Sequence, residues 1–92
     1  MISLKAKKRD PKVNLGKMRK NGDLPAVFYG KQEKATPISV AFKDFVKVWK
    51  EAGESSVVNL QIEDGEDLEA LIQEVDLDPI RSTPRHADFY VF

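Results

Sequence analysis

The sequence predicts a mainly β domain with two helices, built as a small six-stranded, mostly antiparallel barrel or sheet. Short apolar stretches repeatedly alternate with polar residues at a period of two, which is typical of half-buried strands. Turn residues, including an Asp64-Gly65 pair, separate these stretches without a repeating βαβ rhythm. The 92 residues, of which 41% are hydrophobic, are enough for one modest core. We therefore expect a single domain over residues 1–92.

The first half of the chain is predicted to hold three strands and a short helix. Ile2, Leu4 and Ala6 alternate with polar residues and indicate a strand with a basic outer face. A short basic helix follows over residues 13–21 and stops at a Gly. The next strands are expected at 26–29 and 37–40, and the turn between the two begins with residues 30–33. A second helix is expected over residues 42–52, closed by a Gly.

The helix at 42–52 is predicted from one apolar stripe. Phe42, Phe45, Val46 and Trp49 recur at the helical spacing, and charged residues fill the positions between them. Such a stripe could line a ligand groove, but helices ordinarily dock on a core through it. We expect these side chains to pack in the core.

The second half is predicted to form three strands. A hairpin is expected to join residues 58–62 to residues 68–75 through an acidic Asp-Gly turn. A loop over residues 76–84 should lead to a last strand at 85–91. On that strand Ala87, Phe89 and Val91 would face one side, with His86, Asp88 and Tyr90 on the other.

Charge is distributed unevenly although the chain is neutral overall, with 15 basic and 15 acidic residues. The first 34 residues hold ten Lys or Arg against three Asp or Glu, whereas residues 35–80 hold three against eleven. A basic segment of this kind can bind phosphate groups, or it can be a solvated face paired with the acidic middle. The acidic turn at 63–69 lacks calcium-loop spacing and is expected to be a solvated hairpin tip facing away from any nucleic acid.

Other functional classes find little support. The chain has no cysteine, so disulfides, thiolate zinc sites and cysteine nucleophiles are excluded. The N-terminus has no apolar signal region, and no apolar run is long enough to span a membrane. His86 and Asp88 could form an acid–base pair, but no second His or nucleophile motif completes a catalytic set or a metal site. We therefore expect that the protein is not an enzyme and that it binds no metal or other cofactor.

Two motifs at opposite ends of the chain resemble one known family. Leu24-Pro25-Ala26-Val27-Phe28-Tyr29-Gly30 follows a basic helix, and His86-Ala87-Asp88-Phe89 opens the last strand. Both are similar to the bacterial large-subunit ribosomal protein number twenty-five, a family that includes the general stress protein CTC. The resemblance covers nearly the whole chain.

This resemblance implies a six-stranded barrel that binds 5S rRNA at a helical internal loop with non-Watson–Crick pairs. A wide RNA minor groove lined by ribose hydroxyls could be read by Tyr, His and Asp, while basic side chains hold the flanking phosphates. Implied partners are 5S rRNA, the large ribosomal subunit and neighbouring ribosomal proteins, in the cytoplasm. No membrane or small-molecule substrate is expected, and the free protein should be monomeric. The implied RNA-binding residues are Arg9, Lys12, Lys17, Arg19, Lys20, Tyr29, Gln73, His86 and Asp88.

The chain departs from the family pattern in two places. Family members often carry Gln-Arg-His-Pro before the last strand, where this chain has Asp76-Leu77-Asp78-Pro79. The helix has Gly16-Lys17-Met18 where Arg-Arg-Leu is common. The acidic turn suggests weaker RNA binding and keeps open an alternative, a stress-related protein-interaction module of the same fold. Longer members add a second β domain, so the chain is expected to be the short form or that domain alone.

Overall fold

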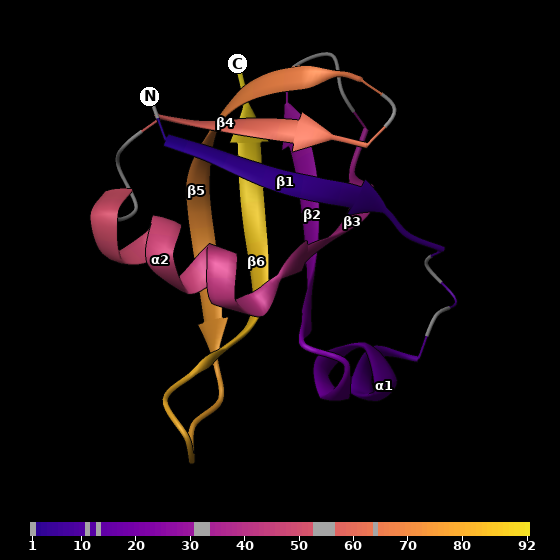
Figure 1. Ribbon diagram of the computed structural model, residues 1–92, viewed down its shortest axis with the longest axis vertical. Coiled ribbons are helices and arrows are strands. Elements are labelled where there is room, and N and C mark those ends of the chain that lie inside the picture. The colour runs from indigo at the N-terminus through magenta and orange to yellow at the C-terminus, as the bar shows by residue number, and fades with distance from the viewer. Residues whose placement is uncertain (1, 11, 13, 31–33, 53–56, 64) are drawn as a thin grey trace.

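The computed structural model describes residues 2–10, 12, 14–30, 34–52, 57–63 and 65–92, and it has the predicted six strands and two helices (Figure 1). Each helix lies between two strands in the chain, and no βαβ unit is repeated. The elements are β1 (Ile2–Lys8), α1 (Leu15–Lys20), β2 (Asp23–Gly30), β3 (Thr36–Ala41), α2 (Phe42–Ala52), β4 (Val57–Ile62), β5 (Asp67–Leu77) and β6 (Pro84–Val91).

The six strands close into a barrel in the order β1-β3-β2-β6-β5-β4. Four neighbouring pairs are antiparallel, which confirms the mostly antiparallel prediction. The other two pairs, β1 with β4 and β2 with β6, are parallel. Because the barrel is closed, each of the six described strands has a hydrogen-bonded neighbour on both sides. The β2–β6 pair also brings the two sequence motifs, which lie far apart along the chain, onto neighbouring strands.

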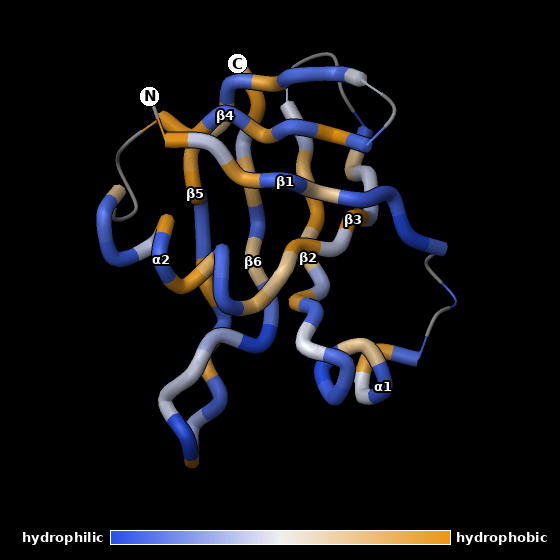
Figure 2. The backbone as a smooth tube through the Cα atoms, viewed as in Figure 1, coloured by the Kyte–Doolittle hydropathy of each residue, from blue (hydrophilic) through white to orange (hydrophobic). Residues whose placement is uncertain are grey.

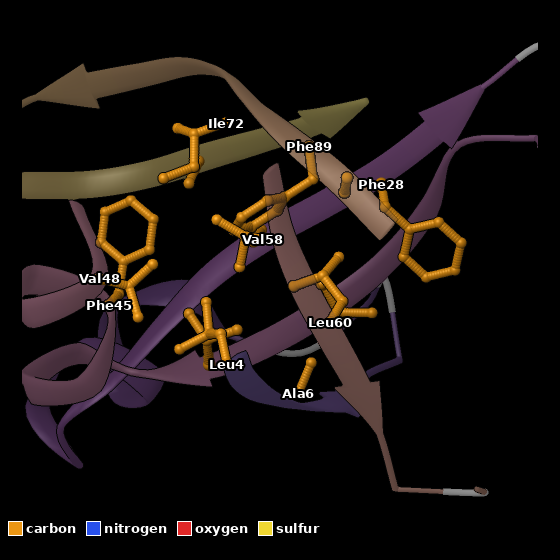
Figure 3. Packing of buried hydrophobic residues seen from close by; sticks show 14 of the residues in the cluster. Leu4, Ala6, Phe28, Phe45, Val48, Val58, Leu60, Ile72 and Phe89 are labelled. Atoms are coloured by element: carbon orange, nitrogen blue, oxygen red, sulfur yellow. The ribbon is translucent and has the colours of Figure 1, made fainter. Parts of the chain in front are cut away.

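The core fills the barrel interior with alternate side chains from every strand, as the period-two pattern predicted (Figure 3). Figure 2 shows the backbone coloured by the hydropathy of each residue. None of the buried residues in the described ranges is charged or polar. The strand residues of this core are Leu4, Ala6, Leu24, Ala26, Phe28, Ile38, Val40, Val58, Leu60, Ile62, Ala70, Ile72, Ala87, Phe89 and Val91.

Helix α2 has the predicted bounds and docks on the barrel through its apolar stripe. Phe45 is fully buried, and its ring meets Phe89 edge-on with centroids 6.1 Å apart (Figure 3). Phe42 and Trp49 pack beside it, partly buried. The prediction for Val46 was wrong, because Val48 is buried in the core while Val46 is only partly covered. The docked stripe is thus centred on Phe45 and rotated slightly from the one expected.

Several predicted boundaries were also too narrow. Strand β2 begins at Asp23 and includes Gly30, which was expected in the turn. Strand β5 continues to Leu77 and β6 begins at Pro84, so the predicted loop over 76–84 is shorter at both ends. Paired strands extend into turn-like sequence because the partner strand supplies hydrogen bonds that local propensity does not register. The predicted turn residues 31–33 and the helix-closing Gly53 lie outside the described residues.

Candidate nucleic-acid interface

The outer face of β2 and β6 gathers the polar and aromatic residues that the two motifs contribute. The parallel register pairs Val27 with Asp88 and Tyr29 with Tyr90. The Tyr29 and Tyr90 rings meet edge-on, with centroids 5.9 Å apart. Both tyrosines are only partly buried. Tyr29 therefore lies on the same face as the distant Asp88.

His86 and Asp88 stand two residues apart on the outer face of β6. Nδ1 of His86 lies 3.3 Å from Oδ1 of Asp88, and each side chain is 29% exposed. This distance suits a carboxylate that orients the imidazole ring. Gln73 sits at a register shift in the adjacent strand β5, between Ile72 and Glu74, and is exposed beside this pair. The structure thus brings Tyr29, Gln73, His86 and Asp88 together on three neighbouring strands.

Arg9 is placed differently from the other predicted cations. Its Nε donates to the carbonyl of Ile38 at 2.8 Å, and Nη2 donates to the carbonyl of Ala26 at 3.2 Å. Partial burial lowers the pKa of this guanidinium. Arg9 therefore ties the end of β1 to β3 and β2, and it keeps further N–H donors beyond these two bonds.

The remaining predicted cations belong to α1 and the segment before it. Helix α1 is capped by Asn14, whose side chain accepts from the Lys17 backbone N–H at 3.1 Å. Lys12, Lys17 and Lys20 have exposed side chains. Met18 is buried and anchors the helix, and at its other end Gly22 adopts a φ of 86°. Lys17 and Lys20 are thus carried on a short, capped helix at the base of β2, and Lys12 lies in the segment before that helix (Figure 1).

Arg19 links this helix to the strand face. Its Nε and Nη2 both donate to the backbone carbonyl of Arg85, at 3.1 and 2.9 Å. Arg85 is the second residue of strand β6 and immediately precedes His86. The contact therefore fixes the cationic helix next to the residues that the second motif supplies.

Arg85 itself was missed by sequence reasoning. Its Nε donates to Oδ2 of Asp76 at 2.8 Å, across the β5–β6 hairpin. This hydrogen bond is the main reason that the pKa of Asp76 is lowered and that of Arg85 raised. Opposite charges flanking a hairpin at positions 76 and 85 were the signal that could have revealed the pair.

The loop beyond Asp76 closes with its own capping bonds. Oδ1 of Asp78 accepts from the backbone N–H groups of Ile80 and Arg81, at 2.8 and 3.2 Å, and these bonds lower its pKa. A hollow of about 360 Å³ lies between this loop and the end of α1, with Arg19, Arg81 and Arg85 among its lining residues. In the acidic turn, where the sequence lacks a basic contact common in the family, Asp76 is thus bonded to the Arg85 side chain and Asp78 to backbone N–H groups.

The acidic hairpin between β4 and β5 is separate from this face. Its turn is closed by the bonds from Ile62 N to Glu66 O and from Gly65 N to Ile62 O, at 2.8 and 3.0 Å. In the barrel order β4 stands opposite β2. The acidic hairpin therefore lies away from β2, although β4 is paired with the basic strand β1.

In the described ranges no group of three or more His, Cys, Asp or Glu is placed to hold a metal ion. Nor does a described helix have the length and apolar character needed to cross a membrane.

Fold and face together define a small closed barrel that presents cations, aromatic rings and hydrogen-bonding side chains over adjoining strands. The chain matches the model of the Ribosomal L25p family over residues 4–89 and belongs to that family. Family membership confirms the expected barrel fold and the resemblance drawn from the two motifs. It also confirms that the chain is not an enzyme, since members are ribosomal proteins.

Three curated relatives carry the name large ribosomal subunit protein bL25. The protein of Shouchella clausii is 37% identical over an alignment that covers 98% of this chain and 42% of the relative. That of Halalkalibacterium halodurans is 37% identical over 97% of this chain and 42% of the relative. That of Geobacillus thermodenitrificans is 42% identical over 96% of this chain and 42% of the relative. The chain thus spans less than half the length of these relatives.

Proposed function

We propose that this domain is a structural component of the large ribosomal subunit that binds 5S rRNA. Its target would be a helical internal loop with non-Watson–Crick pairs, approached through the minor groove. Support comes from membership of the Ribosomal L25p family and from relatives named large ribosomal subunit protein bL25. Ribosome association in the cytoplasm belongs to the same proposal, as does a monomeric state when the protein is not bound.

The parallel pairing of β2 with β6 is the observation that carries the proposal. It sets Tyr29 on the face that holds His86 and Asp88, as two-motif recognition would require. A ring can stack on an unpaired base, while imidazole and carboxylate can bond to ribose hydroxyls and base amino groups. The face is a set of outward side chains on a closed barrel, which suits a broad, shallow groove.

The basic helix supplies the second half of the proposed interface. Lys17 and Lys20 are exposed on α1. Arg19 joins that helix to β6 by donating to the backbone carbonyl of Arg85. Exposed lysines near a groove-reading face can neutralise phosphates and release counterions, which adds affinity without sequence preference. Arg9 stabilises the arrangement of these strands, because it joins the end of β1 to β2 and β3 through hydrogen bonds.

The test is a filter-binding titration of the protein with 5S rRNA at several salt concentrations. We expect saturable binding that exceeds binding to an unrelated RNA hairpin of equal length. Lys17→Ala should weaken binding and reduce the slope of log affinity against log salt by up to about 0.9. Lys43→Ala, an exposed lysine on α2, is the matched control and should bind as the parent does. Equal affinity for both RNAs would refute the proposal.

A further inference from the structure

Resting on the proposed function, we propose that Arg85 is an RNA phosphate-binding residue and that the Asp76 carboxylate masks it by occupying the phosphate position. The resemblance to the family did not assign Arg85 a role. The residue lies between helix α1 and the outer face that carries Tyr29, His86 and Asp88, which is called the reading face below. Its guanidinium already forms an ion pair with the carboxylate of Asp76.

The geometry of the pair resembles the way arginine holds a phosphate. Arg85 Nε lies 2.8 Å from Asp76 Oδ2, and Nη2 lies 3.5 Å from Oδ1, so the carboxylate approaches the side of the guanidinium that presents a fork of donors. Carboxylates and phosphates share this approach to arginine. Both side chains remain about half exposed, at 45% and 53%, so an external anion can reach the same donors.

Three basic side chains, Arg85, Arg19 and His86, lie around the Asp76 carboxylate. Besides the Arg85 hydrogen bond, the charges of Arg85, His86 and Arg19 all contribute to lowering its pKa. The strand register sets Asp76 directly opposite His86, and Arg19 reaches the carbonyl of Arg85. A carboxylate at the meeting point of these groups occupies the place to which their combined field would draw a phosphate.

A strand irregularity puts Arg85 within reach of the reading face. The register passes from the Asp76–His86 pair to the Leu77–Pro84 pair, which leaves Arg85 as the extra residue of a bulge. Bulges re-aim side chains, and here Arg85 and His86 are both accessible although they are consecutive in a strand. A phosphate held by Arg85 would therefore flank the groove contacted by His86.

Masking predicts that removal of Asp76 raises affinity and that this gain depends on Arg85. In the parent protein Arg85→Ala leaves the Asp76 carboxylate without its partner and facing the RNA, so affinity for 5S rRNA should fall rather than rise. Asp76→Asn removes the competing charge and should raise affinity by about three- to tenfold at low salt, with a salt slope steeper by up to about 0.9. Adding Arg85→Ala to Asp76→Asn should then abolish the gain.

Asp67→Asn is the matched control. Asp67 is an exposed aspartate at the other end of the same strand, and its removal changes the net charge equally. If Asp67→Asn raises affinity as much as Asp76→Asn does, or if the gain survives Arg85→Ala, the masking proposal is refuted. Thermal unfolding of each variant verifies that the barrel is intact.

An inorganic pyrophosphate titration followed by the Arg Nε–H resonances in NMR separates this proposal from the proposed function. In the Asp76→Asn variant the Arg85 resonance should shift with pyrophosphate, and in the parent it should shift much less. Failure of the parent to bind 5S rRNA, with the pyrophosphate response present, would overturn the proposed function and leave the masked anion site. Equal Arg85 responses in both proteins would overturn the masking even if 5S rRNA binds tightly.

Discussion

Replacement of Gly30 by Ala tests whether close approach of β2 and β6 holds the candidate interface together. A Cβ atom built on Gly30 would stand 2.4 Å from the carbonyl oxygen of Val91, its register partner on β6. The obstacle is backbone, so no side-chain rotation can relieve it. The two strands would have to separate by about 1 Å to restore an ordinary contact distance.

The expected cost is about 3 kcal/mol of unfolding free energy. Overpacking of a close-packed interior costs about 1–3 kcal/mol, and the upper end applies because a ladder of strand hydrogen bonds must stretch. For a domain of this size each kcal/mol lowers Tm by about 4–8 °C, so we expect a fall of about 12–24 °C. Tyr29 and Tyr90 are the preceding register pair, so their edge-on contact should loosen as well.

Thermal and urea unfolding, followed by circular dichroism, measure this cost. Gly22→Ala is the control, because Gly22 has a φ of 86° and a Cβ there would meet nothing within 4 Å. That variant should lose only the backbone term of about 1–2 kcal/mol. A Gly30→Ala protein no less stable than Gly22→Ala would refute the argument from close approach.

Two further predictions concern the candidate interface and the β5–β6 loop. Tyr29→Ala should weaken 5S rRNA binding by about 1–3 kcal/mol with an unchanged salt slope. Tyr29→Phe should retain most of the affinity if the ring stacks on a base. A change confined to the salt slope would contradict the stacking role of Tyr29. The bonds from Ile80 and Arg81 lower the pKa of Asp78, so their contribution is complete above the ordinary carboxyl pKa of about 3.9 and is lost as pH falls through the lower folded value. Protection of the Ile80 and Arg81 amides from exchange, relative to their intrinsic rates, should therefore fall in acid. Asp78→Asn keeps an acceptor oxygen and should remove that pH dependence. Identical acid profiles of protection in the two proteins would contradict this account.

The face alternation of the strands was predictable because burial on one side of a pleated strand enforces a period of two. Ile38 and Val40 were expected to share a face and are both buried, and His86 and Asp88 were expected opposite Ala87 and are accessible. Helix α2 was predictable to its bounds for the same reason, since its stripe of large apolar residues is long enough to define one docking face. The sequence pattern did not predict that Val48 rather than Val46 is buried, because the barrel surface fixes the final rotation of the helix.

Sequence alone therefore determined the fold class, the family resemblance and the residues that face outward. Only the tertiary structure decided which of those residues meet. The parallel β2–β6 register sets Tyr29 beside the second motif, and barrel closure imposes that register through contacts between segments that no local pattern couples. The masking of Arg85 by Asp76 also depends on closure of the hairpin and on a bulge, because only these bring a carboxylate nine residues away to within 2.8 Å of the guanidinium.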